Sequence, residues 1–177
     1  WKITLDQGAV LPEAGEAQAQ ARLGKFLDNR IFNYANARDI PSLEGTSRIS
    51  QDLRFGILSI REVFARVQER LKGATSEQRR SAQIFVSELC WREFYHQVLW
   101  FKPEVLSYEY SDAYRGLPWL QDPSSFSKWC EGQTGFPIVD AGMRQLRKTG
   151  FMHNRVRMIV AMFLTKDLHL DWRMGEQ

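Results

Sequence analysis

Apolar side chains recur at three- and four-residue spacing along almost the whole of this 177-residue sequence, and this spacing is the period of an amphipathic α-helix. The longest such pattern begins at residues 75–78, a Thr-Ser-Glu-Gln run typical of a helix N-terminus, and ends at Pro103, which stops a helix. No run of strand length alternates apolar and polar residues, and no segment of repeat-protein length recurs. The sequence therefore predicts an all-α domain.

Two shorter helices are expected before this long one. Residues 16–34 carry apolar side chains at helical spacing, and residues 36–41 then favour a loop. A second helix is expected to begin at Ser59, which together with Glu62 matches the capping-box pattern. Gly73 is typical of the residue that closes such a helix.

After residue 103, residues 108–123 are rich in Tyr, Ser, Gly and Pro, which predicts a loop. A further helix is expected with Pro137 in its first turn and Thr149 at its end. Gly150 follows and is typical of a helix C-terminus.

The run from Met158 to Leu164 is apolar on every face, which predicts a helix packed on all sides. Positively charged side chains, among them Arg155 and Arg157, come just before this run. At that place they are unfavourable for stability alone, because the N-terminal end of a helix is already positive. Two interpretations stay open. The side chains bind a phosphate or another anion, or they are surface cations paired with carboxylates elsewhere. The polar residues concerned are His153, Asn154, Arg155 and Arg157.

A second polar group lies on the long predicted helix and crosses its apolar pattern. Spacings of three and four residues put Phe85, Glu88, Arg92 and Tyr95 along one stripe, with Trp91 beside it. The simpler alternative is an ion pair between Glu88 and Arg92, flanked by packed aromatic rings, and residue types alone favour it.

A third candidate is the short run from Gly45 to Ser50. Its hydroxyls, its backbone N–H groups and the guanidinium of Arg48 suit phosphate oxygens. The alternative, which the residues alone favour, is that Ser50 caps a helix that contains Leu53. The spacing of the six tryptophans indicates only core or interface positions.

The composition is that of an ordinary soluble globular protein, with 44% apolar and 25% charged residues. The longest unbroken apolar run, residues 158–164, is too short to cross a bilayer, so we expect no membrane association. The net charge of +3 is compatible with a polyanionic partner but does not require one.

Cys90 and Cys130 show neither a CxxC pattern nor a His spacing, so we expect reduced core residues. No ligand cluster suggests a metal. No charged-then-apolar leader opens the chain, and we expect a cytoplasmic protein. Because the sequence begins with Trp1 and ends without a helix-ending signal, we expect it to be part of a longer chain.

Five motifs are long enough to compare with known families. They are Trp91-Arg-Glu-Phe-Tyr95, Gln133-Thr-Gly-Phe-Pro-Ile-Val-Asp-Ala-Gly-Met-Arg-Gln-Leu146, Gly150-Phe-Met-His-Asn-Arg155, Leu164-Thr-Lys-Asp-Leu168 and Asp171-Trp-Arg173. Together they closely resemble the photolyase/cryptochrome family, and within it the class I cyclobutane pyrimidine dimer DNA photolyases. The resemblance extends from about Tyr34 to the end of the sequence.

The resemblance implies that residues 1–177 are the N-terminal and middle part of a helical FAD-binding domain. In this family, light excites a reduced flavin, which passes an electron to a pyrimidine dimer flipped out of the duplex. The antenna α/β domain with its chromophore, and a C-terminal flavin-pocket segment, are expected to be missing. We therefore expect this segment alone to bind FAD weakly or not at all. The full-length protein is expected to be a monomeric carbon–carbon lyase that acts on UV-damaged DNA containing pyrimidine dimers.

The resemblance also implies roles for individual residues. Contacts to the flavin are implied for Tyr34, Thr46, Ser47, Arg48, Ile49, Ser50, Phe85, Glu88, Arg92, Asn154 and Arg157. Contacts to damaged DNA are implied for Glu88, Trp91, Arg92, Tyr95, Asn154 and Arg155. Catalytic roles are implied for Glu88, which hydrogen-bonds the dimer, for Asn154, whose amide lies near the flavin N5, and for Trp119 and Trp172, the outer and middle members of a tryptophan relay that photoreduces the flavin.

Some positions depart from the family pattern. Phe85 and Phe151 stand where tryptophan is frequent, but both keep an aromatic face, so we expect flavin packing to survive. Asp171-Trp-Arg-Met-Gly175 also resembles the DASH cryptochromes, whereas His153 and Met158 resemble the photolyases. Two alternatives stay open: a cryptochrome-type flavin blue-light photoreceptor, or a helical nucleic-acid-binding module without flavin, whose affinity would fall steeply with salt.

Overall fold

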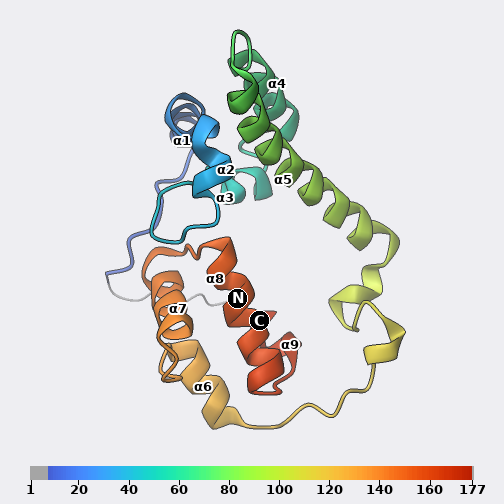
Figure 1. Cartoon of the computed structure of the whole chain (residues 1–177). Helices are drawn as coiled ribbons and strands as arrows, with labels where there is room; N and C mark the ends of the chain where they lie inside the picture. Colours follow the sequence, from blue (N-terminus) through green and yellow to red (C-terminus); the bar gives the residue numbers. More distant parts are fainter. Residues whose placement is uncertain (1–7, 177) are drawn as a thin grey trace. The chain divides into compact units, whose positions relative to one another are not determined.

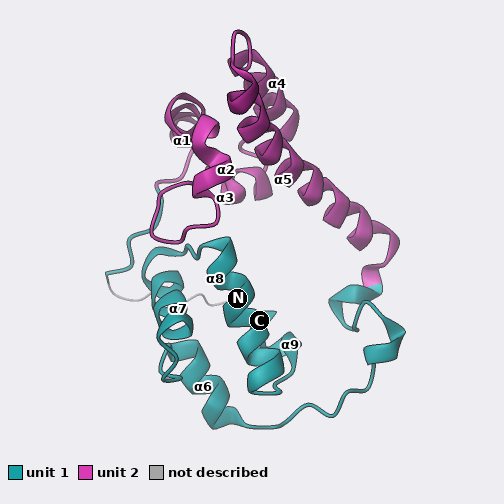
Figure 2. Cartoon of the chain, viewed as in Figure 1, with its two compact units in different colours: residues 1–12, 104–177 teal, residues 13–103 magenta. Residues whose placement is uncertain are grey.

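The computed structural model describes residues 8–176, so Trp1 lies outside the described residues. Within this part of the chain the regular elements are helices (Figure 1), apart from one isolated parallel bridge that joins Leu120 and Leu170. The all-α prediction is therefore confirmed. The chain divides into two compact units (Figure 2). Each unit has its own apolar core. Unit 2 is residues 13–103, and unit 1 is residues 1–12 with 104–177.

Unit 2 is built around the first half of a long helix. Its elements are α1 (Glu16–Asn29), η1 (Ile31–Asn33), α2 (Tyr34–Ala37), α3 (Ser50–Arg54), α4 (Ile60–Arg70) and α5 (Ser76–Phe101). The short elements η1 and α2 pack directly on α5. The residues that meet in the core recur at helical spacing and include Leu23, Phe26, Val63, Val67, Ala82 and Phe85. Their side chains hold α1 and α4 against α5 by apolar burial.

The long helix α5 begins and ends where its sequence predicts. Thr75 Oγ1 accepts a hydrogen bond from the backbone N–H of Gln78, and Gln78 Oε1 accepts one from the backbone N–H of Thr75, so the capping box is complete. Burial along α5 ends at Leu89. Cys90 is exposed, so its predicted core position is wrong, although its thiol is free as expected.

Two local predictions in unit 2 are wrong. The helix expected over residues 16–34 is interrupted at Arg30, whose backbone leaves the helical region with φ −121° and ψ −26°. Ser59 does cap α4, but no side-chain capping bond forms. Glu62 instead accepts a hydrogen bond of 2.8 Å from Gln20 Nε2 of α1. A partner from another helix therefore replaces the local one.

Unit 1 packs its helices around a second core. Its elements are η2 (Pro103–Leu106), whose first residue still belongs to unit 2, η3 (Asp112–Tyr114), α6 (Pro123–Glu131), α7 (Pro137–Thr149), α8 (Asn154–Met162), the π-helical turn η4 (Phe163–Asp167) and α9 (Trp172–Glu176). Helix α7 has the predicted bounds, and Gly150 follows it in the left-handed conformation with φ 65°. Helix α6 was not predicted, although Asp122 caps it and Pro123 occupies its first turn.

Close packing joins α7 to α8. A Cβ atom on Gly142 would lie 2.5 Å from Val156 Cγ1, so only glycine allows this approach. Trp129 of α6 donates a hydrogen bond of 3.1 Å from its indole N–H to the carbonyl of Val160. Cys130, beside that tryptophan, is exposed, and its predicted core position is also wrong.

Helix α8 does not have the predicted all-round burial. Val156 and Val160 are buried, whereas Met158, Ile159 and Met162 are 47%, 43% and 47% exposed. Only one face of α8 therefore packs within the described residues. Among the helices of residues 8–176, none is long and apolar enough to span a membrane. The same residues contain no group of three or more His, Cys, Asp or Glu side chains that could bind a metal ion.

Candidate functional site

A cavity of about 370 Å³ opens in unit 2 between α2, α3 and α5. Seven residues predicted to bind flavin line it: Tyr34, Ser47, Ile49, Ser50, Phe85, Glu88 and Arg92. Four further lining residues, Leu53, Arg54, Leu89 and His96, were not predicted. The stripe on α5 could have indicated His96, because it follows Arg92 by one helical turn.

Two buried aromatic residues, Tyr34 and Phe85, line part of the cavity. The rings of Tyr34 and Phe85 meet edge to face with centroids 5.4 Å apart, and Phe26 contacts both rings from α1. Tyr34 and Phe85 are 7% and 3% exposed. This buried cluster holds the α5 stripe in place and presents an apolar surface to a ligand.

The wall of the cavity is the loop that precedes α3. Gly45 begins this loop in contact with α2, where a Cβ atom would lie 2.6 Å from the carbonyl oxygen of Ala37. Arg48 has φ 55°, a left-handed backbone that is uncommon outside glycine. Its carbonyl accepts a hydrogen bond of 2.8 Å from Gln51 Nε2. These constraints turn the chain so that Ser47 and Ser50 both line the cavity.

Ser50 is the first residue of α3 and not its side-chain cap, so the simpler alternative for this loop is wrong: the N-cap is Ile49, without a side-chain hydrogen bond. Thr46 and Arg48 belong to the same loop but do not line the cavity. Arg48 instead lies 3.8 Å from Glu44, measured from Nη2 to Oε1.

The charged side chains of the stripe are not paired as the local spacing predicts. Glu88 accepts a hydrogen bond of 2.7 Å from Nη1 of Arg38, which also lies over the ring of Tyr34 at 5.4 Å from its centroid. Burial would lower the pKa of the Arg38 guanidinium, but the hydrogen bond to Glu88 and the nearby Tyr34 and Asp39 outweigh it and raise that pKa above its ordinary value. The predicted Glu88–Arg92 pair is wrong.

Arg92 has other partners. Its Nη2 donates a hydrogen bond of 3.2 Å to the backbone carbonyl of Leu53, which joins α5 to α3, and its Nη1 pairs with Glu93. The guanidinium thus stays at the rim of the cavity, where it can meet an anionic group. Neither Arg38 nor the Leu53 contact has a signal in the sequence pattern.

Trp91 and Tyr95 lie outside this cavity. Both are exposed, at 55% and 63%, and together with Phe94 they form a cluster of rings on the outer surface of α5. The Trp91 and Tyr95 rings are stacked with centroids 6.1 Å apart. Such a surface can stack with a planar ligand such as a nucleobase.

The predicted residues of α8 belong to unit 1. His153 caps the helix: its Nδ1 accepts a hydrogen bond of 3.2 Å from the backbone N–H of Arg155, and the residue is only 3% exposed. It is therefore buried as a helix cap and does not lie on the surface. Asn154 and Arg157 are exposed, and Asn154 and Arg155 both contact the sulfur of Met158.

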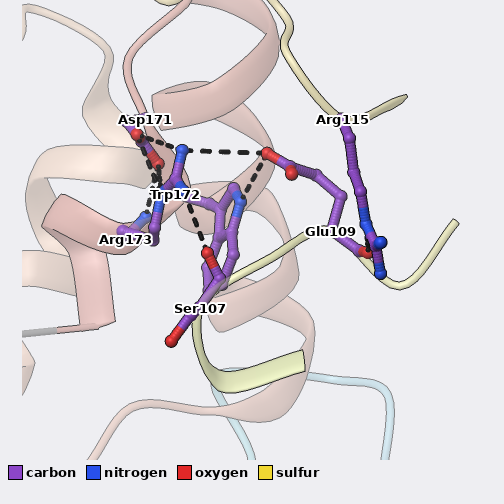
Figure 3. Close-up of polar contacts among 6 residues, drawn as sticks. All are labelled: Ser107, Glu109, Arg115, Asp171, Trp172 and Arg173. Carbon is purple, nitrogen blue, oxygen red and sulfur yellow. Dashed lines mark hydrogen bonds and ion pairs between the residues drawn. The ribbon is translucent and has the colours of Figure 1, made fainter. Parts of the chain in front are cut away.

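Trp119 and Trp172 also belong to unit 1, close to a carboxylate that was not predicted. Trp172 donates a hydrogen bond of 3.2 Å from its indole N–H to Oε1 of Glu109 (Figure 3). The indole nitrogen of Trp119 is buried and has no hydrogen-bond partner within the described residues. No sequence pattern indicates Glu109, which lies 63 residues before Trp172.

The cavity in unit 2 combines features that suit one class of ligand. Serine hydroxyls and arginine side chains can bind phosphate groups, and the Phe85–Tyr34 surface can pack against a flat ring. Glu88 adds an acceptor for N–H groups. A nucleotide that carries an aromatic ring system therefore fits the donor set of this site.

Comparison with known proteins agrees with this chemistry. Residues 85–177 match the family described as the FAD binding domain of DNA photolyase. A protein of Halobacterium salinarum named deoxyribodipyrimidine photo-lyase is 46% identical over 169 residues, which are 94% of this chain and 35% of that protein. The chain thus spans about a third of the length of the curated relatives it matches.

Solved structures show the same fold. A bacterial class III photolyase from Agrobacterium tumefaciens superposes with a TM-score of 0.87 at 41% identity, over 92% of this chain and 33% of that one. A cryptochrome from Synechocystis superposes with a TM-score of 0.86 at 34% identity, over 98% of this chain and 36% of that one.

Proposed function

Since the chain belongs to the DNA photolyase family, we propose that the full-length protein opens cyclobutane pyrimidine dimers in DNA by light-driven electron transfer from reduced FAD. Residues 1–177 then form the N-terminal and middle part of its helical FAD-binding domain. The antenna domain with its chromophore and the C-terminal part of the flavin pocket lie in the remaining two thirds. We also propose that the full-length protein is a class I cyclobutane pyrimidine dimer photolyase.

The observation that best supports this function is the cavity in unit 2, which is lined by the carboxylate residue Glu88, the hydroxyl residues Ser47 and Ser50, Arg92 and the buried ring of Phe85. Tyr34, Phe85 and the residues Thr46, Ser47, Arg48, Ile49 and Ser50 would hold the flavin and its phosphates. When bound, reduced FAD supplies the electron and the absorption of light. The protein contributes position and charge.

Glu88 has a second role in this proposal, toward the dimer. Its carboxylate, oriented by Arg38 at 2.7 Å, would accept hydrogen bonds from the N–H groups of a flipped-out pyrimidine. Arg92 at the cavity rim would contact both ligands. The exposed rings of Trp91 and Tyr95 would pack against the flipped bases, because base–aromatic stacking tolerates any sequence.

We also propose roles for residues of unit 1. Asn154 would hold the flavin edge near N5, Arg157 would contact the flavin, and Arg155 would face the strand with the lesion. Trp119 and Trp172 would be the outer and middle members of the relay that photoreduces the flavin. We further propose that the full-length protein is a cytoplasmic monomer that does not associate with membranes.

The decisive experiment measures dimer repair by the purified full-length protein, with its flavin reduced, on UV-irradiated oligothymidylate under blue light. Wild type should restore the absorbance of intact thymine only in the light. Glu88→Gln should reduce the repair yield about tenfold, because a hydrogen bond to a charged group contributes about 1.5–3 kcal/mol. The control is Glu77→Gln on the same helix, where the side chain is exposed. The proposal would be contradicted if wild type restored the thymine absorbance equally well in the dark, or if it repaired no dimers in the light.

A second function is favoured by one observation, the superposition on a cryptochrome over 98% of this chain. A flavin photoreceptor of this type would bind FAD and change its redox state in blue light but leave dimers intact. The same oligothymidylate assay separates the two functions. Flavin photoreduction without any loss of dimers would support the photoreceptor.

A further inference from the structure

An unassigned carboxylate lies against Trp172. Glu109 is in the loop between η2 and η3, and its Oε1 accepts the indole N–H of Trp172 at 3.2 Å (Figure 3). Its side chain is only 11% exposed. A carboxylate that is removed from water to this extent is costly unless partners compensate it. The groups that contact Glu109 must therefore compensate its carboxylate for the lost contact with water.

Arg173 fixes Glu109 beside the indole. The Arg173 Nε donates hydrogen bonds to both carboxylate oxygens of Asp171, at 2.9 Å to Oδ1 and 3.0 Å to Oδ2. Its Nη1 donates a hydrogen bond of 2.9 Å to the carbonyl of Ser107. Its Nη2 lies 3.9 Å from Glu109 Oε1. From the other side, Arg115 Nε donates to the backbone carbonyl of Glu109 at 3.4 Å. The loop is thus tied to α9 in one arrangement (Figure 3).

The carboxylate is held in its charged form. A backbone hydrogen bond within Glu109 itself and the Trp172 N–H lower the pKa of this carboxyl below its ordinary value, against the opposing effect of burial. Arg173 and the indole N–H of Trp119 lower the pKa further. Both tryptophans therefore act on the same carboxylate, although only Trp172 makes a hydrogen bond to it.

A fixed negative charge at this place favours one electronic state of the neighbouring ring. An indole that has lost an electron is a cation, and a carboxylate bonded to its N–H stabilises that cation more than it stabilises the neutral ring. Because the side chain is largely removed from solvent, this attraction is screened less than at the protein surface. A neutral acceptor in the same position would keep the hydrogen bond but lose most of this effect.

We propose that Glu109 is a positioning residue of the electron relay, whose carboxylate stabilises the oxidised indole of Trp172. The inference rests on the proposed function, in which Trp172 is the middle member of that relay. One electron leaves Trp172 for an excited oxidised flavin or a tryptophan that this flavin has oxidised. No bond breaks, and the indole keeps its N–H proton on the Glu109 bond. Trp119 then gives one electron to Trp172, and a soluble one-electron reductant restores Trp119.

The test uses the full-length flavoprotein with Glu109→Gln, which keeps an acceptor oxygen and removes the charge. Time-resolved absorption after a light flash measures the yield of oxidised tryptophan, and steady blue light with a soluble reductant measures flavin photoreduction. Both should fall about tenfold, the effect expected for a hydrogen bond to a charged group. The matched control is Glu104→Gln, the same substitution at an exposed carboxylate of the same unit; it should behave as wild type.

A merely structural role for Glu109 predicts different results. The indole N–H resonance of Trp172 in nitrogen-labelled protein without flavin reports the hydrogen bond directly. It should stay close to its wild-type position in Glu109→Gln and move in Glu109→Ala. If Glu109→Gln loses relay function while this resonance and the thermal midpoint are kept, the charge is what matters. The proposal is wrong if the yield of oxidised tryptophan falls only in variants whose thermal midpoint also falls, because destabilisation would then explain the loss.

Trp172→Phe separates this inference from the proposed function. Loss of photoreduction in Trp172→Phe together with a wild-type relay in Glu109→Gln would overturn the role of Glu109 and leave the proposed function intact. Unchanged photoreduction in Trp172→Phe would overturn both the relay assignment and the role of Glu109. Dimer repair by the chemically reduced protein would still test the proposed function, because that reaction needs no relay.

Discussion

Arg38, at the C-terminal end of α2, and Glu88, in the middle of α5, form an ion pair of 2.7 Å at the candidate flavin site. Fifty residues separate them in the sequence. The pair is partly exposed, with side chains 17% and 36% accessible, so its net contribution to stability is small. Its main effect is to orient the Glu88 carboxylate in the cavity.

Replacement of Arg38 tests that orientation. Arg38→Met keeps an unbranched side chain but removes the donor, so we expect unfolding free energy to fall by only about 1 kcal/mol. Dimer repair by the full-length protein should fall several-fold, because Glu88 loses its fixed position. A double-mutant cycle with Glu88→Gln measures the coupling. Additive effects on repair would show that the pair does not orient Glu88.

Gly45 is predicted to be irreplaceable for steric reasons. In Gly45→Ala the new Cβ would lie 2.6 Å from the Ala37 carbonyl oxygen, which is backbone and moves only with α2. We expect a loss of about 1–3 kcal/mol in unfolding free energy. Flavin content should fall as well, because the loop at residues 46–50 is displaced.

Gly24 is the matched control for this substitution. It lies inside α1, where the nearest atom to a new Cβ would be Arg66 Nη2 at 3.8 Å. Gly24→Ala should therefore raise the unfolding free energy by about 0.5–1 kcal/mol. Thermal unfolding of both variants checks the pair of predictions, and equal effects of the two substitutions would contradict the steric explanation.

Asp140 should make stability depend on acidic pH. Burial would raise the pKa of its carboxyl, but hydrogen bonds from the side chain and backbone of Thr134 and from the backbone of Gly135 outweigh burial and lower the pKa. A group with a lowered pKa binds its proton less readily in the folded state than in the unfolded state. Its stabilisation is thus complete above the ordinary pKa of an aspartate and is lost as pH falls through the folded value.

Asp140→Asn removes this titration. The midpoint of thermal unfolding should be lower than that of wild type at neutral pH, and the difference should shrink as the pH approaches and passes the lowered pKa. Measurements of both proteins across the acidic range check this. A difference that is constant with pH would show that the charge of Asp140 does not contribute.

Trp91 is predicted to contribute to DNA binding through stacking. Trp91→Ala in the full-length protein should weaken binding of dimer-containing DNA by about 1–3 kcal/mol, the range for base–aromatic stacking. Trp100→Ala is the control, since Trp100 is also exposed on α5 but nine residues further on, which is the opposite side of a helix. Fluorescence anisotropy with labelled DNA measures both affinities. Equal losses in the two variants would exclude a specific role for the Trp91 face.

The prediction of helices succeeded where the signals are local. The capping residues Thr75 and Gln78 and the Pro137 and Gly150 boundaries lie within one turn of the helix ends that they specify. Helix α6 was overlooked because it is short, although Asp122 and Pro123 do mark its start. The expected all-round burial of α8 was wrong because composition alone does not tell which face of a helix has a neighbour.

In the candidate site, too, local spacing predicted which residues share a face but not which partners they contact. The stripe of Phe85, Glu88 and Arg92 follows from helical period, and these three residues do line one cavity. Helical spacing does not predict the partners of the charged residues. Glu88 accepts a hydrogen bond from Arg38, and Glu62 accepts one from Gln20, each across a long stretch of sequence. Local spacing predicted a neighbour on the same helix in both cases.

The amino-acid sequence by itself determined the helices, their caps and the motifs of the family, because periodicity, capping and motif order are properties of neighbouring residues. Only the tertiary structure decided which carboxylate meets which donor, from the Arg38–Glu88 pair to the Glu109–Trp172 bond. The physical reason is that hydrogen bonds and charges act over a few ångströms in space, and the packing of apolar faces chooses which distant residues come within that range.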